Sequence, residues 1–80
     1  MPVPVTVRYW AGARRAAGRD SEQLQAEDLA ELRIRIGDRT PELQRVLAAS
    51  TLLVNAQASR LGQELHEGDV IDVLPPFAGG

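Results

Sequence analysis

Apolar and polar residues alternate over the first ten positions of the chain. Val3, Val5, Val7 and Tyr9 share one face of an extended segment, with mostly polar residues between them. A period of two is typical of a strand with one buried face, so we predict that a strand begins the fold. Trp10 falls on the opposite face, where we favour a place at the edge of the core over a place on a partner surface.

The middle of the chain carries the end signals of helices. Gly18 follows an alanine-rich segment and suits a glycine C-cap. Asp28, with Glu31 three residues later, is typical of a capping box, and Gly37 ends that helical pattern. Thr40–Pro41 is a second helix start, with proline at the first helical position. The expected helices are residues 11–17, 28–37 and 40–49, the last two being either separate helices or one long helix broken near Gly37.

Three further segments are expected to be strands. Residues 51–55 and 70–74 are apolar runs of strand type. Residues 20–26 are polar and favour a helix by composition, but they follow a turn-like segment, so we predict a strand that pairs with the first one. Two segments between the last strands, residues 56–60 and 66–69, are typical of turns.

The order of these elements predicts an α+β fold. The first and last strands are the most apolar, which suits neighbouring central strands of one mixed sheet with a helix packed on one face. We expect one domain over residues 1–74, followed by an extended tail over residues 75–80.

Composition narrows the classes of function. The chain has 80 residues, a length that suits one small domain. It contains no cysteine and one histidine, and its net charge is −2. We therefore expect no bound metal or cofactor, no nucleic-acid partner and no membrane partner. A cytoplasmic protein is the expectation. All nine basic residues are arginine, which codon bias explains most simply, although a protein with an activated end would also benefit from lacking lysine amines.

The last six residues form the candidate reactive segment. Pro75 and Pro76 fix φ and keep the chain extended, so the tail is expected to leave the domain as a stiff arm. Phe77 can occupy an apolar pocket, while small residues beyond it can enter a narrow channel. The group expected to react is the carboxylate of Gly80, reached through Ala78 and Gly79.

Five segments carry a recognisable pattern, namely residues 8–11, 14–18, 54–55, 65–71 and 74–80. Together they resemble the small sulfur-carrier subunit of molybdopterin synthase, the MoaD type. The family has the ubiquitin-like β-grasp fold, which agrees with the order of elements predicted above. This chain departs from the family pattern at Val70, where an acidic residue is usual, and at Phe77, where valine is frequent.

The resemblance implies a sulfur-carrying cycle. An ATP-dependent, ubiquitin-activating-like enzyme adenylates the Gly80 carboxylate, and a persulfide donor converts the adenylate to a thiocarboxylate. The loaded tail then enters the large subunit of molybdopterin synthase and gives its sulfur to cyclic pyranopterin monophosphate. Two transfers build the dithiolene of molybdopterin. On this interpretation the chain is the sulfur-donating subunit, is not catalytic alone, and joins a heterotetramer.

Simpler roles are expected for several residues on the surface. Leu74 and Phe77 are candidates for an exposed partner-binding patch with Pro75 and Pro76, the alternative being that Leu74 closes the end of the core. The carboxylates of Glu67, Asp69 and Asp72 are expected to be solvated turn and strand residues. Arg14 and Arg15 are expected on a solvated helix face.

Four alternative functions are compatible with the same fold and C-terminal tail. A thiamine-type carrier would use the same chemistry with a thiazole-forming partner, although that family usually lacks the two prolines. A carrier for cysteine synthesis and a ubiquitin-like modifier joined to lysines of other proteins are the next two. The last is a binding module whose terminal glycines have no chemical role.

Overall fold

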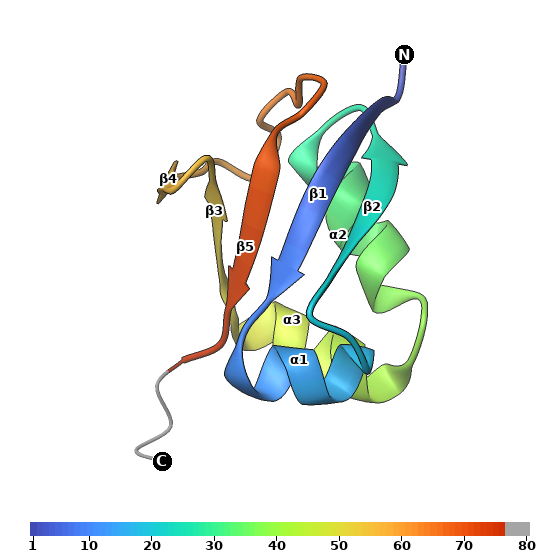
Figure 1. Ribbon diagram of the computed structural model, residues 1–80, viewed down its shortest axis with the longest axis vertical. Helices are drawn as coiled ribbons and strands as arrows, with labels where there is room; N and C mark the ends of the chain where they lie inside the picture. The colour runs from blue at the N-terminus through green and yellow to red at the C-terminus, as the bar shows by residue number, and fades with distance from the viewer. Residues whose placement is uncertain (77–80) are drawn as a thin grey trace.

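The computed structural model describes residues 1–76, which form a five-stranded sheet and three helices. In Figure 1, α2 lies behind β1 and β2, and α1 and α3 cross the lower end of the sheet, where β5 ends. The elements in chain order are β1 (Val3–Tyr9), α1 (Ala11–Ala17), β2 (Ser21–Ala26), α2 (Leu29–Gly37), α3 (Pro41–Ala49), β3 (Thr51–Val54), β4 (Gln57–Ala58) and β5 (Val70–Leu74).

The sheet has the strand order β2-β1-β5-β3-β4. The first and last strands are neighbours and run parallel, with Tyr9 opposite Val73, and every other pair in this sheet of residues 1–76 is antiparallel. The mixed sheet and its central pair are therefore confirmed. The polar segment before α2 is also a strand, since β2 pairs with β1 over six residues.

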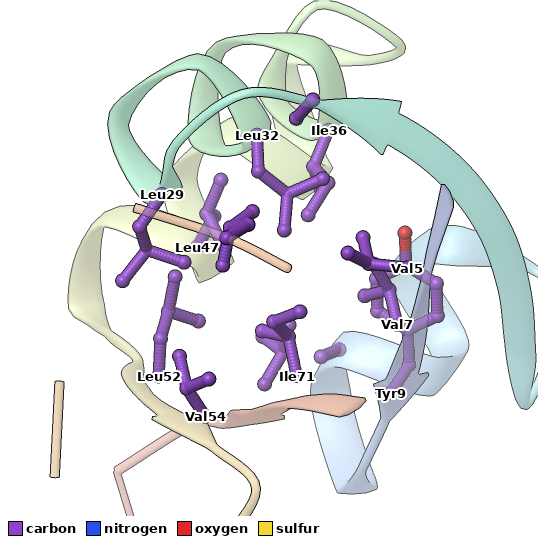
Figure 2. Packing of buried hydrophobic residues seen from close by; sticks show 14 of the residues in the cluster. Val5, Val7, Tyr9, Leu29, Leu32, Ile36, Leu47, Leu52, Val54 and Ile71 are labelled. Atoms are coloured by element: carbon purple, nitrogen blue, oxygen red, sulfur yellow. The ribbon is translucent and has the colours of Figure 1, made fainter. Parts of the chain in front are cut away.

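One apolar core lies between the sheet and the helices (Figure 2). The alternation in β1 sends Val5, Val7 and Tyr9 into this core, and β5 contributes Ile71 and Val73. The helices contribute residues at helical spacing. The helical members of the core are Ala13, Leu29, Leu32, Ile36, Leu43 and Leu47.

The helix ends follow the expected signals. The Asp28 carboxylate accepts from the Glu31 amide at 2.8 Å, and the Glu31 side chain accepts from the Glu27 amide at 2.7 Å. The Thr40 hydroxyl accepts from the Leu43 amide at 3.0 Å and begins α3. The two longer helices are therefore separate, and each has its own N-cap.

Gly18 has the left-handed conformation that a glycine C-cap requires. Its φ is 77°, and its amide donates to the Arg14 carbonyl at 2.9 Å. This bond ends α1 and turns the chain toward β2.

The buried hydroxyl of Tyr9 is satisfied by β2. It donates to the Glu22 carboxylate at 2.5 Å, and burial, followed by this bond, raises the pKa of Tyr9. Glu22 also pairs with Arg39, which lies between α2 and α3, and with Arg19. These contacts connect the sheet to the loop that joins the two helices.

The prediction of a simple turn over residues 56–60 was wrong in part. Asn55 and Ala56 both have positive φ, 52° and 66°, and form a two-residue turn between β3 and β4. Positive φ at both central positions is the geometry that joins antiparallel strands tightly. Ala56 has a side chain that disfavours this conformation, so the sequence did not indicate the hairpin.

Within residues 1–76, no helix has the length and apolar character needed to cross a lipid bilayer.

Two leucine-sized side chains on α2 provide a matched test of the core. Leu32 is fully buried and Ile34 is 62% exposed. We expect Leu32→Ala to lower the free energy of unfolding by about 2–5 kcal/mol, because it leaves a cavity in the core. Ile34→Ala should change it by less than about 0.5 kcal/mol. Urea denaturation followed by circular dichroism measures both, and equal losses would contradict the assignment of the buried face.

Candidate functional site

The candidate site is the end of the sheet from which the tail leaves. Ile71 and Val73 point into the core, so alternation places Val70, Asp72 and Leu74 on the opposite face, which we call the open face. The Trp10 amide donates to the Val73 carbonyl at 3.3 Å. The start of α1 and the end of β5 are therefore side by side.

The structure describes only some of the residues that are expected to bind a partner. Leu74 and Pro75 are half-buried, and Pro76 is exposed. Leu74 lies outside the core cluster and on the open face. This position favours its membership of an exposed partner-binding patch over the alternative that it closes the end of the core. The remaining residues expected to react or bind, Phe77, Ala78, Gly79 and Gly80, lie outside the described residues.

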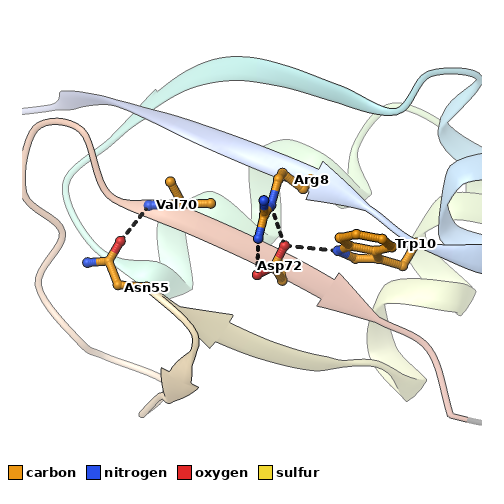
Figure 3. Close-up of polar contacts among 5 residues, drawn as sticks. All are labelled: Arg8, Trp10, Asn55, Val70 and Asp72. Carbon is orange, nitrogen blue, oxygen red and sulfur yellow. Dashed lines mark hydrogen bonds and ion pairs between the residues drawn. The ribbon is translucent and has the colours of Figure 1, made fainter.

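The expectation that Asp72 is solvated was wrong. Asp72 is only 5% exposed although it is on the open face. The Arg8 side chain donates to both carboxylate oxygens, from Nε at 2.7 Å and from Nη2 at 2.9 Å, and Trp10 Nε1 donates to Oδ1 at 2.9 Å (Figure 3). We call these three residues the Arg8–Trp10–Asp72 cluster. The parallel register explains it, because Arg8 lies directly opposite Asp72.

The electrostatics of the cluster favour an ionised carboxylate. The hydrogen bonds from Arg8 lower the pKa of Asp72, burial opposes that change, and the Trp10 N–H adds to the lowering. A two-pronged contact between guanidinium and carboxylate is also geometrically specific. The cluster therefore fixes the relative positions of β1, β5 and the indole ring.

Trp10 is held on two sides and exposed on the rest. The Arg8 guanidinium carbon lies 5.6 Å from the centre of the indole ring, a distance suited to a cation–π contact. Even so, 45% of Trp10 is exposed. The preference for a place at the edge of the core was wrong, because the indole N–H bonds to Asp72 on the open face and Trp10 lies outside the core cluster.

Asp69 was also expected to be solvated, and its side chain is only 12% exposed. Its carboxylate accepts from Asn55 Nδ2 at 2.9 Å and from the His66 amide at 2.8 Å. Asn55 in turn accepts from the Val70 amide at 2.9 Å (Figure 3). These bonds join the turn after β3 to the start of β5, and Glu67 alone of the three carboxylates is exposed as expected.

The remaining charged candidates have the expected surroundings. Arg14 and Arg15 are exposed on α1, and Arg14 lies 3.5 Å from the Asp20 carboxylate. Among residues 1–76, no group of three or more potential ligand side chains is placed to hold a metal ion. The site thus consists of a rigid support for the tail and a polar cluster beside it.

Sequence reasoning missed the cluster, but a signal was present. Arg8 lies on the open face of β1, Trp10 directly follows that strand, and Asp72 is the only polar residue of the last strand. An acidic residue within an apolar strand suggests a partner of opposite charge on the neighbouring strand.

Comparison with known proteins identifies relatives. A family model described as the ThiS family matches residues 7–80. A structure described as a molybdopterin converting factor subunit 1 from Pyrococcus furiosus is 28% identical, with 92% of this chain and 98% of that chain covered and a TM-score of 0.85. No curated protein matches the chain.

Two further structures cover nearly the whole chain. The small archaeal modifier protein 1 from Methanosarcina acetivorans is 26% identical, with 100% of this chain and 99% of that chain covered and a TM-score of 0.88. A complex of subunits 1 and 2 of the molybdopterin-converting factor from Helicobacter pylori contains a chain that is 29% identical, with 98% and 100% covered and a TM-score of 0.76. The expected ubiquitin-like β-grasp fold is confirmed by these neighbours.

The cluster predicts how stability depends on pH. Because the folded-state pKa of Asp72 is lowered, the carboxylate stabilises the fold above its unfolded pKa of about 3.9, and this contribution is lost as pH falls through the folded-state value. Asp72→Asn should lower the urea midpoint at pH 7, and the difference from the unsubstituted protein should shrink toward pH 2. A difference that stays constant over this range would contradict the ion pair.

Proposed function

The chain belongs to the ThiS family of ubiquitin-like sulfur carriers, and on that premise we propose that it is the small, sulfur-donating subunit of molybdopterin synthase. The observation that carries the proposal is the similarity over almost the whole chain to a structure described as subunit 1 of molybdopterin converting factor and to a chain in a complex of subunits 1 and 2 of that factor. In this role the protein is not catalytic alone. Its Gly80 carboxylate is the reacting group.

The first chemical step overcomes the low reactivity of a carboxylate. A carboxylate oxygen of Gly80 attacks the α-phosphorus of ATP, pyrophosphate leaves, and a glycyl adenylate forms. AMP is a good leaving group, so the acyl carbon now accepts a nucleophile. This step belongs to a separate ATP-using adenylyltransferase of the ubiquitin-activating type.

The second step exchanges oxygen for sulfur. The terminal sulfur of a persulfide donor attacks the acyl carbon and expels AMP, which leaves an acyl disulfide. A second thiol then attacks the donor's sulfur in this acyl disulfide. The second thiol and the donor become joined by a disulfide, and the glycyl thiocarboxylate is released. The chain itself has no cysteine, so the sulfur must come from the donor.

The loaded tail then delivers sulfur in the large subunit. The thiocarboxylate sulfur attacks a carbon of cyclic pyranopterin monophosphate, and a carbon–oxygen bond of that carbon breaks, so that sulfur replaces oxygen there. Water then cleaves the remaining acyl–sulfur bond, which leaves the sulfur on the pterin and returns the Gly80 carboxylate. Two such transfers supply the two sulfurs of the dithiolene. Ala78 and Gly79 are narrow enough to enter a channel, and Phe77 provides an apolar contact at its mouth.

The described residues support this use of the tail. Pro75 and Pro76 follow directly from β5, a central strand of the sheet, so the tail begins at a rigid point. The large-subunit partner is inferred from the Helicobacter pylori complex of subunits 1 and 2, and a heterotetramer is the expected assembly.

Protein modification is the second candidate function. The similarity to the small archaeal modifier protein 1 extends over the full chain, which favours a modifier as the alternative. In that role the Gly80 acyl group would pass to amines of other proteins. A thiazole-forming partner of the thiamine pathway remains a further outcome of the experiments below.

The terminal glycine is tested by deletion. Incubation with the adenylyltransferase, ATP and a persulfide donor should raise the protein's mass by the difference between sulfur and oxygen, read by intact-mass spectrometry. Deletion of Gly80 should abolish both this change and molybdopterin formation with the large subunit, while the urea midpoint stays unchanged. Thiocarboxylate formation followed by sulfur delivery only to thiazole synthase would move the function to thiamine synthesis.

Phe77 is tested by affinity. Phe77→Ala should weaken binding to the large subunit by about tenfold or more, because an aromatic side chain in a pocket is a typical interface hot spot. Isothermal titration calorimetry measures the affinity, and Leu61→Ala is the matched control, since Leu61 is 67% exposed in a loop before β5. An unchanged affinity for Phe77→Ala would overturn the assigned contact.

A further inference from the structure

The two edges of the sheet differ in length. β4, at one edge, has two residues, whereas β2, at the other edge, has six (Figure 1). An edge strand exposes unpaired main-chain N–H and C=O groups, and proteins protect long edges with proline, lysine, a bulge or an inward-pointing charge. β2 contains neither proline nor lysine, and it pairs with β1 through consecutive residues without a bulge. One edge of this sheet is therefore short, and the other is long and lacks these three protections.

The main-chain groups of alternate residues in β2 point away from the sheet. The Thr6 amide donates to the Asp69 carbonyl at 2.9 Å, so the main-chain groups of Thr6 point away from β2. Gln23 lies opposite Thr6 in an antiparallel pair, and opposite residues of such a pair both point toward or both point away from each other. The N–H and C=O of Gln23, and those of Ser21 and Gln25, therefore point outward. In the part of the chain that the structure describes, no main-chain hydrogen bond outside the helices and strand pairs uses these groups.

The one charged side chain of β2 does not protect this edge. Glu22 points inward, and its side chain is only 5% exposed. An inward charge protects an edge when an added strand would bury it without a partner. Glu22 already accepts from the Tyr9 hydroxyl and from Arg39, so it keeps its partners when a strand is added. The three outward residues are serine and glutamine, whose uncharged side chains do not repel a second strand.

The edge of β2 is complementary to itself in one antiparallel register. When Gln23 lies opposite Gln23 of a second copy, Ser21 lies opposite Gln25, and all three outward residues of each copy are paired. About six hydrogen bonds then cross the edge, two for each pair of residues. The arrangement has a two-fold axis through Gln23, and two-fold symmetry is the commonest symmetry of soluble dimers.

Charges at the two ends of β2 favour the same register. Arg19 precedes the strand and Glu27 follows it, and their side chains are 55% and 57% exposed. In the symmetric register, Arg19 of one copy lies opposite Glu27 of the other at both ends of the paired strands. Opposite charges in these positions fix the register and disfavour other partners. Within the chain their salt bridges are long, 3.4 Å from Arg19 to Glu22 and 3.6 Å from Glu27 to the N-terminal amine.

We propose that the edge of β2 binds a second copy of this chain, so that two antiparallel β2 strands join the two sheets into one. Any extended peptide could use the main-chain groups, but a second copy also provides the symmetric register and the two pairs of opposite charges. One pair of strands is a small interface, so the dimer is expected to be reversible and weak. β1 separates β2 from β5, so the pairing leaves Leu74 and Pro75 uncovered in both copies.

The dimer is tested by sedimentation equilibrium of the full chain from micromolar to millimolar concentration. The apparent mass of the unsubstituted protein should rise toward twice that of one chain. Gln23→Pro removes the N–H at the two-fold axis and should keep the protein monomeric over the whole range. Proline is tolerated where the N–H of an edge strand faces solvent, so the circular dichroism of dilute Gln23→Pro should match that of the unsubstituted protein. Sulfur loading of Gly80 should be the same in both proteins.

The register is tested by reversing charges. Arg19→Glu and Glu27→Arg should each weaken the dimer by about tenfold, because two attractive pairs in each dimer become repulsive. The double variant restores both pairs and should dimerise as the unsubstituted protein does. Arg60→Glu is the matched control, since Arg60 is exposed after β4, at the opposite edge, and the substitution changes the net charge by the same amount as Arg19→Glu. It should weaken the dimer much less than Arg19→Glu.

Amide exchange followed by NMR reports the same contact directly. In dilute protein the amides of Ser21, Gln23 and Gln25 should exchange rapidly with solvent, since they point outward. In concentrated protein these three amides should become protected, while exchange at the β4 edge stays unchanged.

The outcomes separate this inference from the proposed function. A protein that stays monomeric at millimolar concentration would overturn the dimer and leave the chemistry of Gly80 untouched. A dimer that Gln23→Pro and both charge reversals leave intact would be formed by another surface, which also overturns the proposal. Protection of the outward amides only after another protein is added would assign the edge to that protein and exclude the second copy. If Gln23→Pro does not fold, the charge reversals and the amide exchange decide the question.

Discussion

The parallel pairing of β1 and β5 is the constraint on which the rest of the structure depends. The two strands are the first and last of the domain, and they occupy neighbouring positions within the sheet. Since parallel strands run in the same direction, the start of α1 and the start of the tail emerge at the same end. The register also sets Arg8 opposite Asp72, and a shift by one residue would move Asp72 toward the core and Ile71 toward solvent.

Much of this architecture could be predicted because the local sequence patterns favour the same elements as the tertiary packing does. The alternation from Val3 to Tyr9 defines a buried face by itself, and the caps at Asp28 and Thr40 place two helix starts to the residue. The polar strand β2 could be predicted only from its position, since its composition favours a helix. Its pairing with β1 overrides that local preference.

The parts that sequence reasoning missed are those that depend on contacts between distant residues. Asp72 is 64 residues from Arg8, so its place within an apolar strand suggests a cationic partner but does not identify which arginine provides it. The turn at Asn55 and Ala56 uses a conformation that alanine disfavours, so the hairpin depends on the strand pairing around it. The reactive end of the candidate site, Phe77 to Gly80, lies outside the described residues, and its assignment rests on the sequence and the family.

The Asn55 side chain gives the tail a fixed origin. By bonding to both the Asp69 carboxylate and the Val70 amide, it holds the first residue of β5 against the turn after β3, and the five residues of the strand then set where Leu74 ends. The tail is consequently a short tether with one immobile end. In the proposed function, docking of the domain would confine Gly80 to the small volume that six residues can reach, at an effective concentration on the order of millimolar. Sulfur delivery would then depend on the placement of a folded domain, and free diffusion of a peptide would have little part in it.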